Sequence, residues 1–518
     1  MPVLDLRLAD LPAEQHHVVA PARREVEQPR VEVLHLGTGR VDPAHAVRDR
    51  IGCTRDVLGR LAHLSGREVA AVAGDPRHEL GLPHLRVGEL AAPSDHSLRN
   101  RTKRHERRVR LGDGEESRHH AAMITTAVGV GQRLREGRAA PPDVSVARTP
   151  RDAVVIFVWS RAAIWIGALF SFYWFEPNRH PNAARWDSPL LHELGSATDV
   201  WARWDSVFFL RIAEHGYDHA SAAFGPLYPA LVWVVGHLLF GHYVVGGIIV
   251  SLATALGAFV LLHAAAERSL GADGARRAVL YLALFPMALF LQAVYSESLF
   301  LLLVLAAFAF AERGRWTLAG VTTGLAILTR IAGVALLPAL AVLAWRRPDR
   351  RSALARLALS LPIAAVYPLV LWRQVGDPWA FAHAQGRWHR HFWPLGGVWQ
   401  AFVHWVPAGA GHAHALAVNG EGLAFLILFV ALTVVTWRRF GAAYGVFAAT
   451  SLAIPLSFPS SRWPLLSLPR FGLVIFPFFL AGAALTAGRP RLHTAVVAWS
   501  ALGLGIAVVQ WALWQWVA

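Results

Sequence analysis

The chain has 518 residues, of which 54% are hydrophobic and 21 are tryptophan, so it is too apolar for an ordinary soluble protein. Its single cysteine, Cys53, excludes an internal disulfide. The formal net charge of +15 would suit a nucleic-acid-binding protein, but after residue 150 the basic residues lie in short runs between apolar stretches, which is typical of membrane proteins.

Residues 1–150 differ from the rest of the chain. They contain no Phe, Trp or Tyr, hold 11 of the 25 histidines, and show no helical periodicity. Without aromatic side chains to fill a core, this segment is predicted to be non-globular, either as a disordered cytoplasmic extension or as a stretch upstream of the true translation start. A basic nucleic-acid module is disfavoured because the charges alternate in sign. We expect residues before Met123 to be dispensable for activity.

From residue 152 onward, apolar stretches that could cross or nearly cross a bilayer recur to the end. We therefore predict that 151–518 form an all-α polytopic membrane domain with about 11 transmembrane helices. The predicted crossings are 153–175, 243–265, 278–294, 298–311, 316–328, 332–345, 353–373, 421–437, 441–458, 471–487 and 493–516.

Arginine placement predicts the orientation. Five short loops carry arginines, namely Arg268, Arg276 and Arg277; Arg313 and Arg315; Arg346, Arg347, Arg350, Arg351 and Arg356; Arg438 and Arg439; and Arg489 and Arg491. With the crossings above, all five fall on the side of Arg148 and Arg151, which the positive-inside bias makes cytoplasmic. All five loops lie on one side only if 226–240 does not cross the membrane and 316–345 crosses it twice. We therefore predict that 226–240 is a helix on the outer surface and that 316–345 bends at LTRIAG, 328–333.

The outer side then carries two large loops, roughly 176–242 and 374–420, and three short turns. Polar residues gather there: Arg203, Asp205, Arg211, Glu214, Tyr295, Glu297, Arg330, Arg462 and Arg470. Carboxylates near arginines at a lipid–water boundary suit an enzyme that deprotonates a hydroxyl and handles a phosphate. The alternative is that these residues are interfacial anchors and turn residues.

The second outer loop contains six histidines between His383 and His414. Pairs of histidines separated by a single residue could bind a metal. However, the irregular spacing of the six and the lack of a carboxylate among them before Glu421 favour a solvated loop. We predict no metal ligands, and no cofactor with certainty, while a divalent-metal requirement stays open.

Six segments, in order, resemble the PIG-V family of mannosyltransferase-like membrane proteins, over about residues 150–490. They are RWDSVFFLRIAEHGY (203–217), FGPLYPALV (224–232), YSESLFLLL (295–303), LTRIAGVALLPAL (328–340), GDPWAFAHAQGRW (376–388) and LPRFGLVIFPFF (468–479). The Trp–Asp pair followed by Pro-Leu-Tyr-Pro is the most specific part.

The resemblance implies a C-type glycosyltransferase (GT-C) helical bundle that uses polyprenyl-phosphate sugar donors outside the cytoplasm. It implies that Asp205, in the first outer loop, is the catalytic base and that Glu297 is a second acidic site residue. It also implies a surface helix after the base, matching 226–240. The first outer loop lacks an Asp-x-Asp pair, which is why the metal requirement stays open.

The predicted function is therefore transfer of a sugar, in particular mannose, from a polyprenyl-phosphate donor to a lipid or glycan acceptor on the extracytoplasmic face. Direct displacement at the anomeric carbon would invert its configuration. Donor-phosphate binding is predicted for Arg330, Arg470 and Arg203. Substrate binding is predicted for Trp204, Tyr228, Tyr295 and Arg462.

Two further expectations concern the first outer loop. Arg203 or Arg211 is expected to keep Asp205 ionised, and Phe208 and Phe209 to anchor the loop among lipids. The expected partners are the donor, the acceptor and membrane lipids, with no nucleic acid. A lipid-linked-sugar flippase or transporter, or a non-catalytic membrane subunit, is the alternative. No internal repeat is visible, and the polar residues gather at one face, which favours an enzyme.

Overall fold

The structure is a computed structural model that describes residues 151–178, 186–403, 412–461 and 463–517. The predicted extension 1–150 lies outside the described residues. In the described part every regular element is a helix, and the one isolated β-bridge joins Arg390 to Ser460. The predicted all-α class is confirmed.

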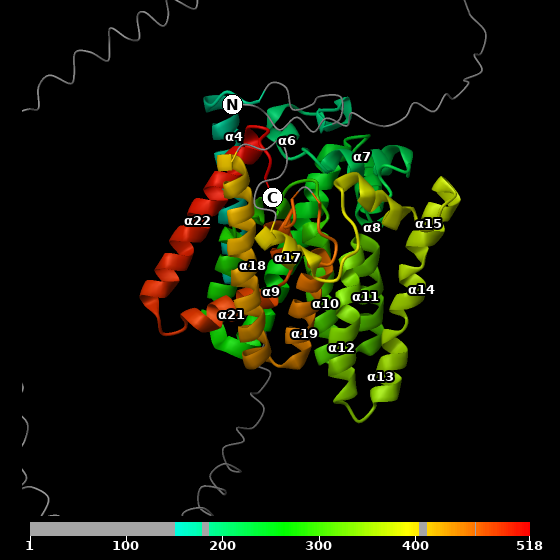
Figure 1. The fold of residues 1–518 in the computed structure, drawn as a ribbon, viewed down its shortest axis with the longest axis vertical. Helices are drawn as coiled ribbons and strands as arrows, with labels where there is room; N and C mark the ends of the chain where they lie inside the picture. The colour runs from blue at the N-terminus through cyan, green and yellow to red at the C-terminus, as the bar shows by residue number, and fades with distance from the viewer. Residues whose placement is uncertain (1–150, 179–185, 404–411, 462, 518) are drawn as a thin grey trace, which may run out of the picture. The chain divides into compact units, whose positions relative to one another are not determined.

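Five helical stretches have the length and composition to cross a membrane, so the chain is a multi-pass membrane protein (Figure 1). They are α4 (Arg151–Trp174), α9 (Tyr243–Leu284), 350–375, 416–440 of α18 (His412–Phe440), and α22 (Pro490–Ala512). Shorter apolar helices are α8 (Leu227–Leu238), α11 (Trp316–Thr329), α12 (Leu336–Trp345), α19 (Ala442–Leu456) and α21 (Pro477–Thr486). The predicted number of crossings is not confirmed.

The remaining helices complete these stretches or lie in the connecting segments. The 350–375 stretch consists of α13 (Arg350–Leu357), α14 (Ser360–Ala364) and α15 (Val366–Val375). The others are α6 (Ser196–Asp199), α7 (Ser206–His215), α10 (Glu297–Glu312), α16 (Ala380–His383), α17 (Gly396–Val403) and α20 (Leu468–Gly472), with the 3₁₀ turns η1 (Pro189–Leu191), η2 (Ala288–Leu291), η3 (Ile331–Ala335) and η4 (Ala384–Trp388). The predicted crossing 471–487 is interrupted, because α20 and α21 are separate helices.

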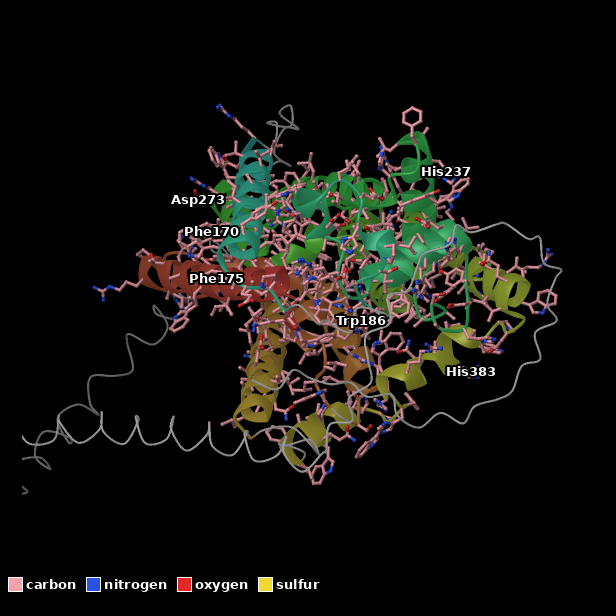
Figure 2. The ribbon with its side chains drawn as sticks, turned by 90° about the horizontal axis from the view of Figure 1, so that it is seen from above. Phe170, Phe175, Trp186, His237, Asp273 and His383 are labelled. Atoms are coloured by element: carbon pink, nitrogen blue, oxygen red, sulfur yellow. The ribbon has the colours of Figure 1, made fainter. Side chains whose placement is uncertain are left out.

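Helix α4 has the surface of a helix that faces lipid. Its side chains Trp159, Phe170, Tyr173 and Trp174 are between 55% and 74% exposed. Figure 2 shows Phe170 toward the edge of the bundle, whereas Trp186, which is buried, lies nearer its middle. Aromatic side chains at such positions suit the boundary between hydrocarbon and headgroups.

Two of the predicted crossings, 243–265 and 278–294, are joined in the long helix α9. The helix breaks at Gly271, which has a φ of 72°, a left-handed conformation that glycine adopts without strain. Because of this break, α9 is two helical segments, as the two predicted crossings require.

The second of these crossings is helical only in part. α9 ends at Leu284, and the chain continues through the 3₁₀ turn η2 rather than as an α-helix. Arg161, buried in α4, donates to the carbonyl oxygens of Ala283 and Ala288, at 3.2 and 2.7 Å. These bonds satisfy acceptors that the break would otherwise leave without partners inside a membrane bundle.

The predicted bend within 316–345 is confirmed. Helix α11 ends at Thr329, and Arg330 has the extended conformation (φ −152°, ψ 134°) before η3 begins. A Cβ on Gly333 would lie 2.6 Å from the backbone nitrogen of Ile327, so the returning chain packs directly on α11 and only glycine fits there.

Arginine-rich loops gather at one end of the helices. Arg268 pairs with Glu312, the last residue of α10, at 2.7 Å. Arg277 donates to the carbonyl of Thr486, at the end of α21, at 3.1 Å. We call this the arginine end. Glu297 begins α10 and lies at the opposite end, about 24 Å away at ~1.5 Å per residue.

Candidate active site

Asp205 lies at the start of helix α7, within the predicted first outer loop, 176–242. The preceding Trp204 has a φ of 55°, a left-handed conformation that costs free energy for a large side chain. Asp205 occupies the N-cap position of α7, yet its carboxylate makes no capping hydrogen bond. Its Oδ2 instead accepts a hydrogen bond from Arg470 Nη1 at 3.1 Å. The tight backbone turn therefore directs this carboxylate into the bundle.

Three hydrogen bonds hold the Asp205 segment against the turn before α10. Val294 N donates to Trp201 O at 3.0 Å, and Ser206 Oγ donates to Val294 O at 3.1 Å. The Asp205 backbone N–H donates to Tyr295 Oη at 3.0 Å. Since Glu297 follows two residues after Tyr295, this docking brings the two predicted catalytic carboxylates together.

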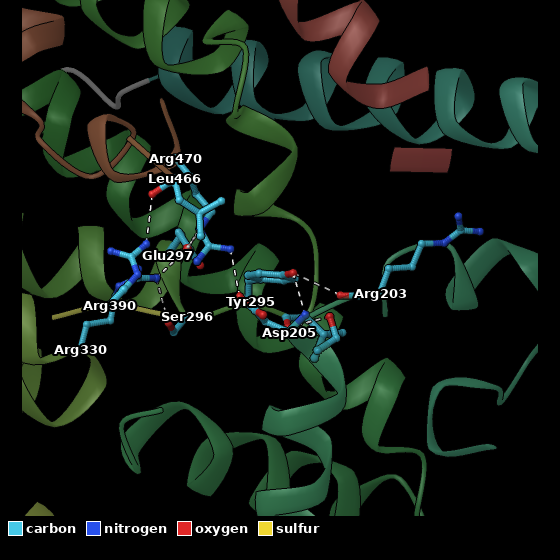
Figure 3. A network of polar contacts seen from close by, with 11 residues as sticks. Arg203, Asp205, Tyr295, Ser296, Glu297, Arg330, Arg390, Leu466 and Arg470 are labelled. Carbon is cyan, nitrogen blue, oxygen red and sulfur yellow. Dashed lines mark hydrogen bonds and ion pairs between the residues drawn. The ribbon is translucent and has the colours of Figure 1, made fainter. Parts of the chain in front are cut away.

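Arg470 connects these carboxylates (Figure 3). Besides its bond to Asp205, its Nε lies 3.2 Å from Glu297 Oε1, an ion-pair distance without hydrogen-bond geometry. Arg330 Nη1 donates to the same Glu297 oxygen at 2.6 Å. The sequence predicted all four residues as site residues, and the structure brings them into one network.

The network is nearly closed to solvent. The side chains of Asp205 and Arg470 are each 12% exposed, and Glu297 is 1% exposed. Glu297 Oε2 has no hydrogen-bond partner among the described residues. Although burial lowers the pKa of Arg470, the charges of Glu297 and Asp205 outweigh burial and hold it above its usual value. Arg470 is therefore a permanent cation, and a buried acceptor is left for a ligand to satisfy.

Arg390, in the predicted second outer loop, is a further cation that the sequence analysis did not single out. It donates to the carbonyl oxygens of Phe458 and Leu466, at 3.2 and 3.1 Å. The Phe471 ring lies within 6 Å of the guanidinium carbons of Arg390, Arg330 and Arg470. Burial, and then repulsion by Arg470, lowers the pKa of Arg390 to about 10. Its only sequence signal was its position beside the GDPWAFAHAQGRW segment, 376–388, which is one of the six that carry the family resemblance.

Arg203 does not face Asp205. Figure 3 shows its side chain pointing away from the network. Its Nη1 donates to the carbonyl oxygens of Trp511 and Ala512, both at 2.9 Å, and its guanidinium lies over the Trp514 ring. Burial lowers the pKa of Arg203 to about 9. Arg203 thus ties the first outer loop to the C-terminal helix. Arg211 is exposed, so the expectation that Arg203 or Arg211 pairs with Asp205 is wrong, because Arg470 takes that position.

The expectation that Phe208 and Phe209 anchor the loop among lipids is also wrong. They are 7% and 3% exposed. The Phe208 ring stacks on Phe224, with centroids 4.9 Å apart, and Phe209 packs edge-on against Tyr228 and Phe224. Their apolar surface is removed from water by the loop's own aromatic core rather than by lipid.

Two predicted substrate-binding tyrosines have structural hydrogen bonds. Tyr228 is fully buried, and its Oη contacts Gly247 O and Ser251 Oγ at 3.1 and 2.8 Å. The hydroxyl of Tyr295 donates to Arg203 O at 3.2 Å while accepting from Asp205 N. Tyr295 therefore positions Asp205.

Trp204 is half-buried in an aromatic cluster with Trp186, Trp514 and Trp516. The fourth predicted substrate-binding residue, Arg462, lies outside the described residues. Among the residues described, no group of three or more His, Cys, Asp or Glu could hold a metal ion.

A histidine lies between two aspartates in the predicted first outer loop. His192 lies 2.6 Å from Asp187 Oδ1 and 3.3 Å from Asp199 Oδ2. Desolvation lowers the pKa of His192, but the hydrogen bonds and charges of Asp199 and Asp187 outweigh it and raise the pKa above 6.5. A raised folded-state pKa contributes stability that is present below the unfolded value and is lost as pH rises through the folded value.

We therefore expect His192→Gln to lower the melting temperature most below pH 6.5, and progressively less as the pH rises through the folded-state pKa. Thermal melts of the wild type and the variant across this range measure the difference. A melting-temperature difference that does not vary with pH would show that the two aspartates do not hold a protonated imidazole.

Comparison with known proteins matches the part of the chain that contains Asp205, Glu297 and Arg330. Residues 194–343 match the family model described as mannosyltransferase (PIG-V). In this region the chain is PIG-V-like. GPI alpha-1,6-mannosyltransferase 2 of Rattus norvegicus is 33% identical over 177 residues, which are 30% of this chain and 35% of that protein. The chain thus spans about a third of the length of this relative.

Among solved structures, the chain is similar to ArnT from Cupriavidus metallidurans, whose crystal structure contains bound undecaprenyl phosphate. The TM-score is 0.42 and the identity 19%, over 68% of this chain and 62% of ArnT. The PIG-V match ends at residue 343, so Arg390 and Arg470 lie beyond it.

Proposed function

We propose that residues 151–518 form an integral membrane glycosyltransferase of the GT-C type. It moves a sugar, in particular mannose, from a polyprenyl-phosphate donor to a lipid or glycan acceptor. The observation that carries this proposal is the pairing of Asp205 and Glu297 with one buried arginine, Arg470. The PIG-V match and the mannosyltransferase relative support the choice of mannose.

The site works on the extracytoplasmic face. It lies at the end of α10 opposite the arginine end, and positive-inside bias assigns arginine-rich loops to the cytoplasm. With the arginine end inside, the N-terminal start of α4 is cytoplasmic and the Asp205 network faces out. A lipid-linked donor can then present its phosphate at the membrane surface, where the arginines are.

Donor binding changes the partners of Arg470. In the structure Asp205 is ion-paired, and a carboxylate held by an arginine is a weakened base. The donor phosphate binds Arg330 and Arg470, whose planar guanidinium groups match its oxygens. Because the phosphate takes over the Arg470 hydrogen bond, Asp205 is released as the base only when the donor is present.

Transfer is then a single displacement. Asp205 accepts the proton of the acceptor hydroxyl while that oxygen bonds to the anomeric carbon. The bond from this carbon to the phosphate oxygen breaks, and the polyprenyl phosphate leaves with its charge stabilised by the arginines. Attack from the opposite face inverts the configuration. Glu297 orients Arg330 and Arg470, and its unpaired Oε2 accepts a hydrogen bond from a sugar hydroxyl.

The test is an assay of the purified protein in liposomes with polyprenyl-phosphate-mannose and a panel of lipid and glycan acceptors. We expect a mannosylated product with inverted configuration from the wild type, and a product yield reduced at least about 10²-fold from Asp205→Asn. If the intact donor crosses the bilayer at equal rates with both proteins and no product forms, the protein is a flippase and not a glycosyltransferase.

A further inference from the structure

A second basic site lies at the arginine end. An open cavity of about 370 Å³ is lined by Asp273, Arg276, Arg277, Leu280 and His493, from the second segment of α9 and the start of α22. Figure 2 shows Asp273 at the edge of the bundle. The cavity is separate from the Asp205 network, since Arg277 is bonded to the end of α21 opposite that network.

The walls of the cavity are held by hydrogen bonds. Thr486 Oγ1 donates to Gly482 O at 3.0 Å and accepts from the Tyr281 hydroxyl at 2.8 Å. With its proton used in this way, Tyr281 Oη accepts from His493 Nδ1–H at 2.7 Å. This chain of hydrogen bonds fixes the imidazole plane at the wall of the cavity.

The charges favour an anion. Arg276 and Arg277 outnumber Asp273, so the wall supplied by α9 has a net positive charge. Helix α22 begins beside the cavity, and the N-terminus of a 23-residue helix adds the positive end of its dipole. Guanidinium groups with this geometry suit phosphate oxygens.

The surface next to the cavity favours a lipid rather than a soluble phosphate. Along α22, the side chains of Leu492, Trp499, Leu502 and Ile506 are between 41% and 74% exposed. This apolar strip begins one residue before His493 and runs along a candidate membrane span. An acyl chain can follow the strip while its phosphate occupies the cavity, and basic pockets between transmembrane helices bind anionic head groups in this way.

We propose that this cavity binds the phosphate head group of an anionic phospholipid in the cytoplasmic leaflet. The proposal needs the orientation described above but not the transfer reaction. Its test measures lipid binding and not activity. The lipid site can therefore be disproved while the proposed function stands, and the proposed function can be disproved while the lipid site stands.

The test is native mass spectrometry of the purified full chain, titrated with phosphatidylglycerol or with phosphatidylcholine, with and without inorganic phosphate. Arg276→Ala is the informative variant, because Arg276 is exposed and its loss should not unfold the protein. Arg439→Ala, an exposed arginine of α18 that does not line the cavity, is the matched control. Thermal melts of both variants verify that each is folded.

We expect phosphatidylglycerol to bind the wild type and the Arg439→Ala control more tightly than phosphatidylcholine does. Arg276→Ala should bind phosphatidylglycerol about fivefold more weakly. Equal phosphatidylglycerol affinity in all three proteins would overturn the site. Displacement of phosphatidylglycerol by inorganic phosphate at comparable concentration would overturn the lipid assignment and indicate a soluble anion.

Discussion

Asp205→Asn is expected to lower turnover by ~10²–10⁴-fold while the protein folds, inserts and binds donor. Asparagine keeps the size of aspartate but cannot accept the proton of the acceptor hydroxyl at neutral pH. Since the Asp205 side chain does not cap α7, its replacement leaves the start of that helix intact. The backbone bond to Tyr295 Oη also survives, because the Asp205 N–H makes it.

The matched control is Asp218→Asn, in the same predicted outer loop. Asp218 bonds to Ser221 through its carboxylate, at 2.6 and 2.8 Å, and belongs to a local turn. We expect this variant to lose some stability and to keep its turnover. Yield, melting temperature, donor affinity and turnover should be measured for both variants. A well-folded Asp205→Asn protein with near-normal turnover would show that Asp205 is not the base.

Arg470→Ala is expected to affect both stability and donor binding. It removes the cation between Asp205 and Glu297 and leaves Asp205 without its ion-pair partner. Removing one partner of a buried ion pair typically costs ~3–5 kcal/mol of stability. Here Arg330 still pairs with Glu297, so we expect the loss to be near the lower end, ~3 kcal/mol, together with a large fall in donor affinity.

Arg470→Lys separates charge from geometry. Lysine keeps the positive charge but lacks the planar fork, so it should restore most of the stability and only part of the donor affinity. Denaturant or thermal unfolding measures the first, and binding of a labelled polyprenyl phosphate measures the second. Donor affinity that is equal in the wild type and in Arg470→Ala would remove Arg470 from the phosphate site. The same comparison of Ala and Lys variants applies to Arg330, which lies closer to Glu297 than Arg470 does.

The sequence by itself predicted the all-α class and which polar residues gather at one end. Hydropathy and positive-inside bias depend on local composition, so the bend at Arg330 and the grouping of the arginine-rich loops were predictable from the printed residues. The family resemblance implied Asp205 and Glu297 as site residues, and the gathering of polar residues on one side added Arg330 and Arg470 to the same candidate site.

Where apolar residues point was decided only by the tertiary structure. Lipid and protein interior are both apolar, so composition cannot tell a lipid-facing phenylalanine from a packed one. Phe208 and Phe209 therefore looked like interfacial anchors and are core residues. For the same reason, the crossing predicted from hydropathy at 278–294 extends beyond Leu284, where α9 ends. There the buried Arg161 donates to backbone carbonyl oxygens on both sides of the break.

Charge partners were likewise decided by the fold. Asp205 has Arg203 nearby in sequence, but its ion-pair partner is Arg470, 265 residues further along the chain. Arg203 instead bonds to carbonyls 308 and 309 residues away. A long arginine side chain reaches whichever acceptors the packed helices present, and burial makes an unpaired charge too costly to leave. The sequence therefore predicted which charges belong to the candidate site, whereas helix packing decided which of them meet.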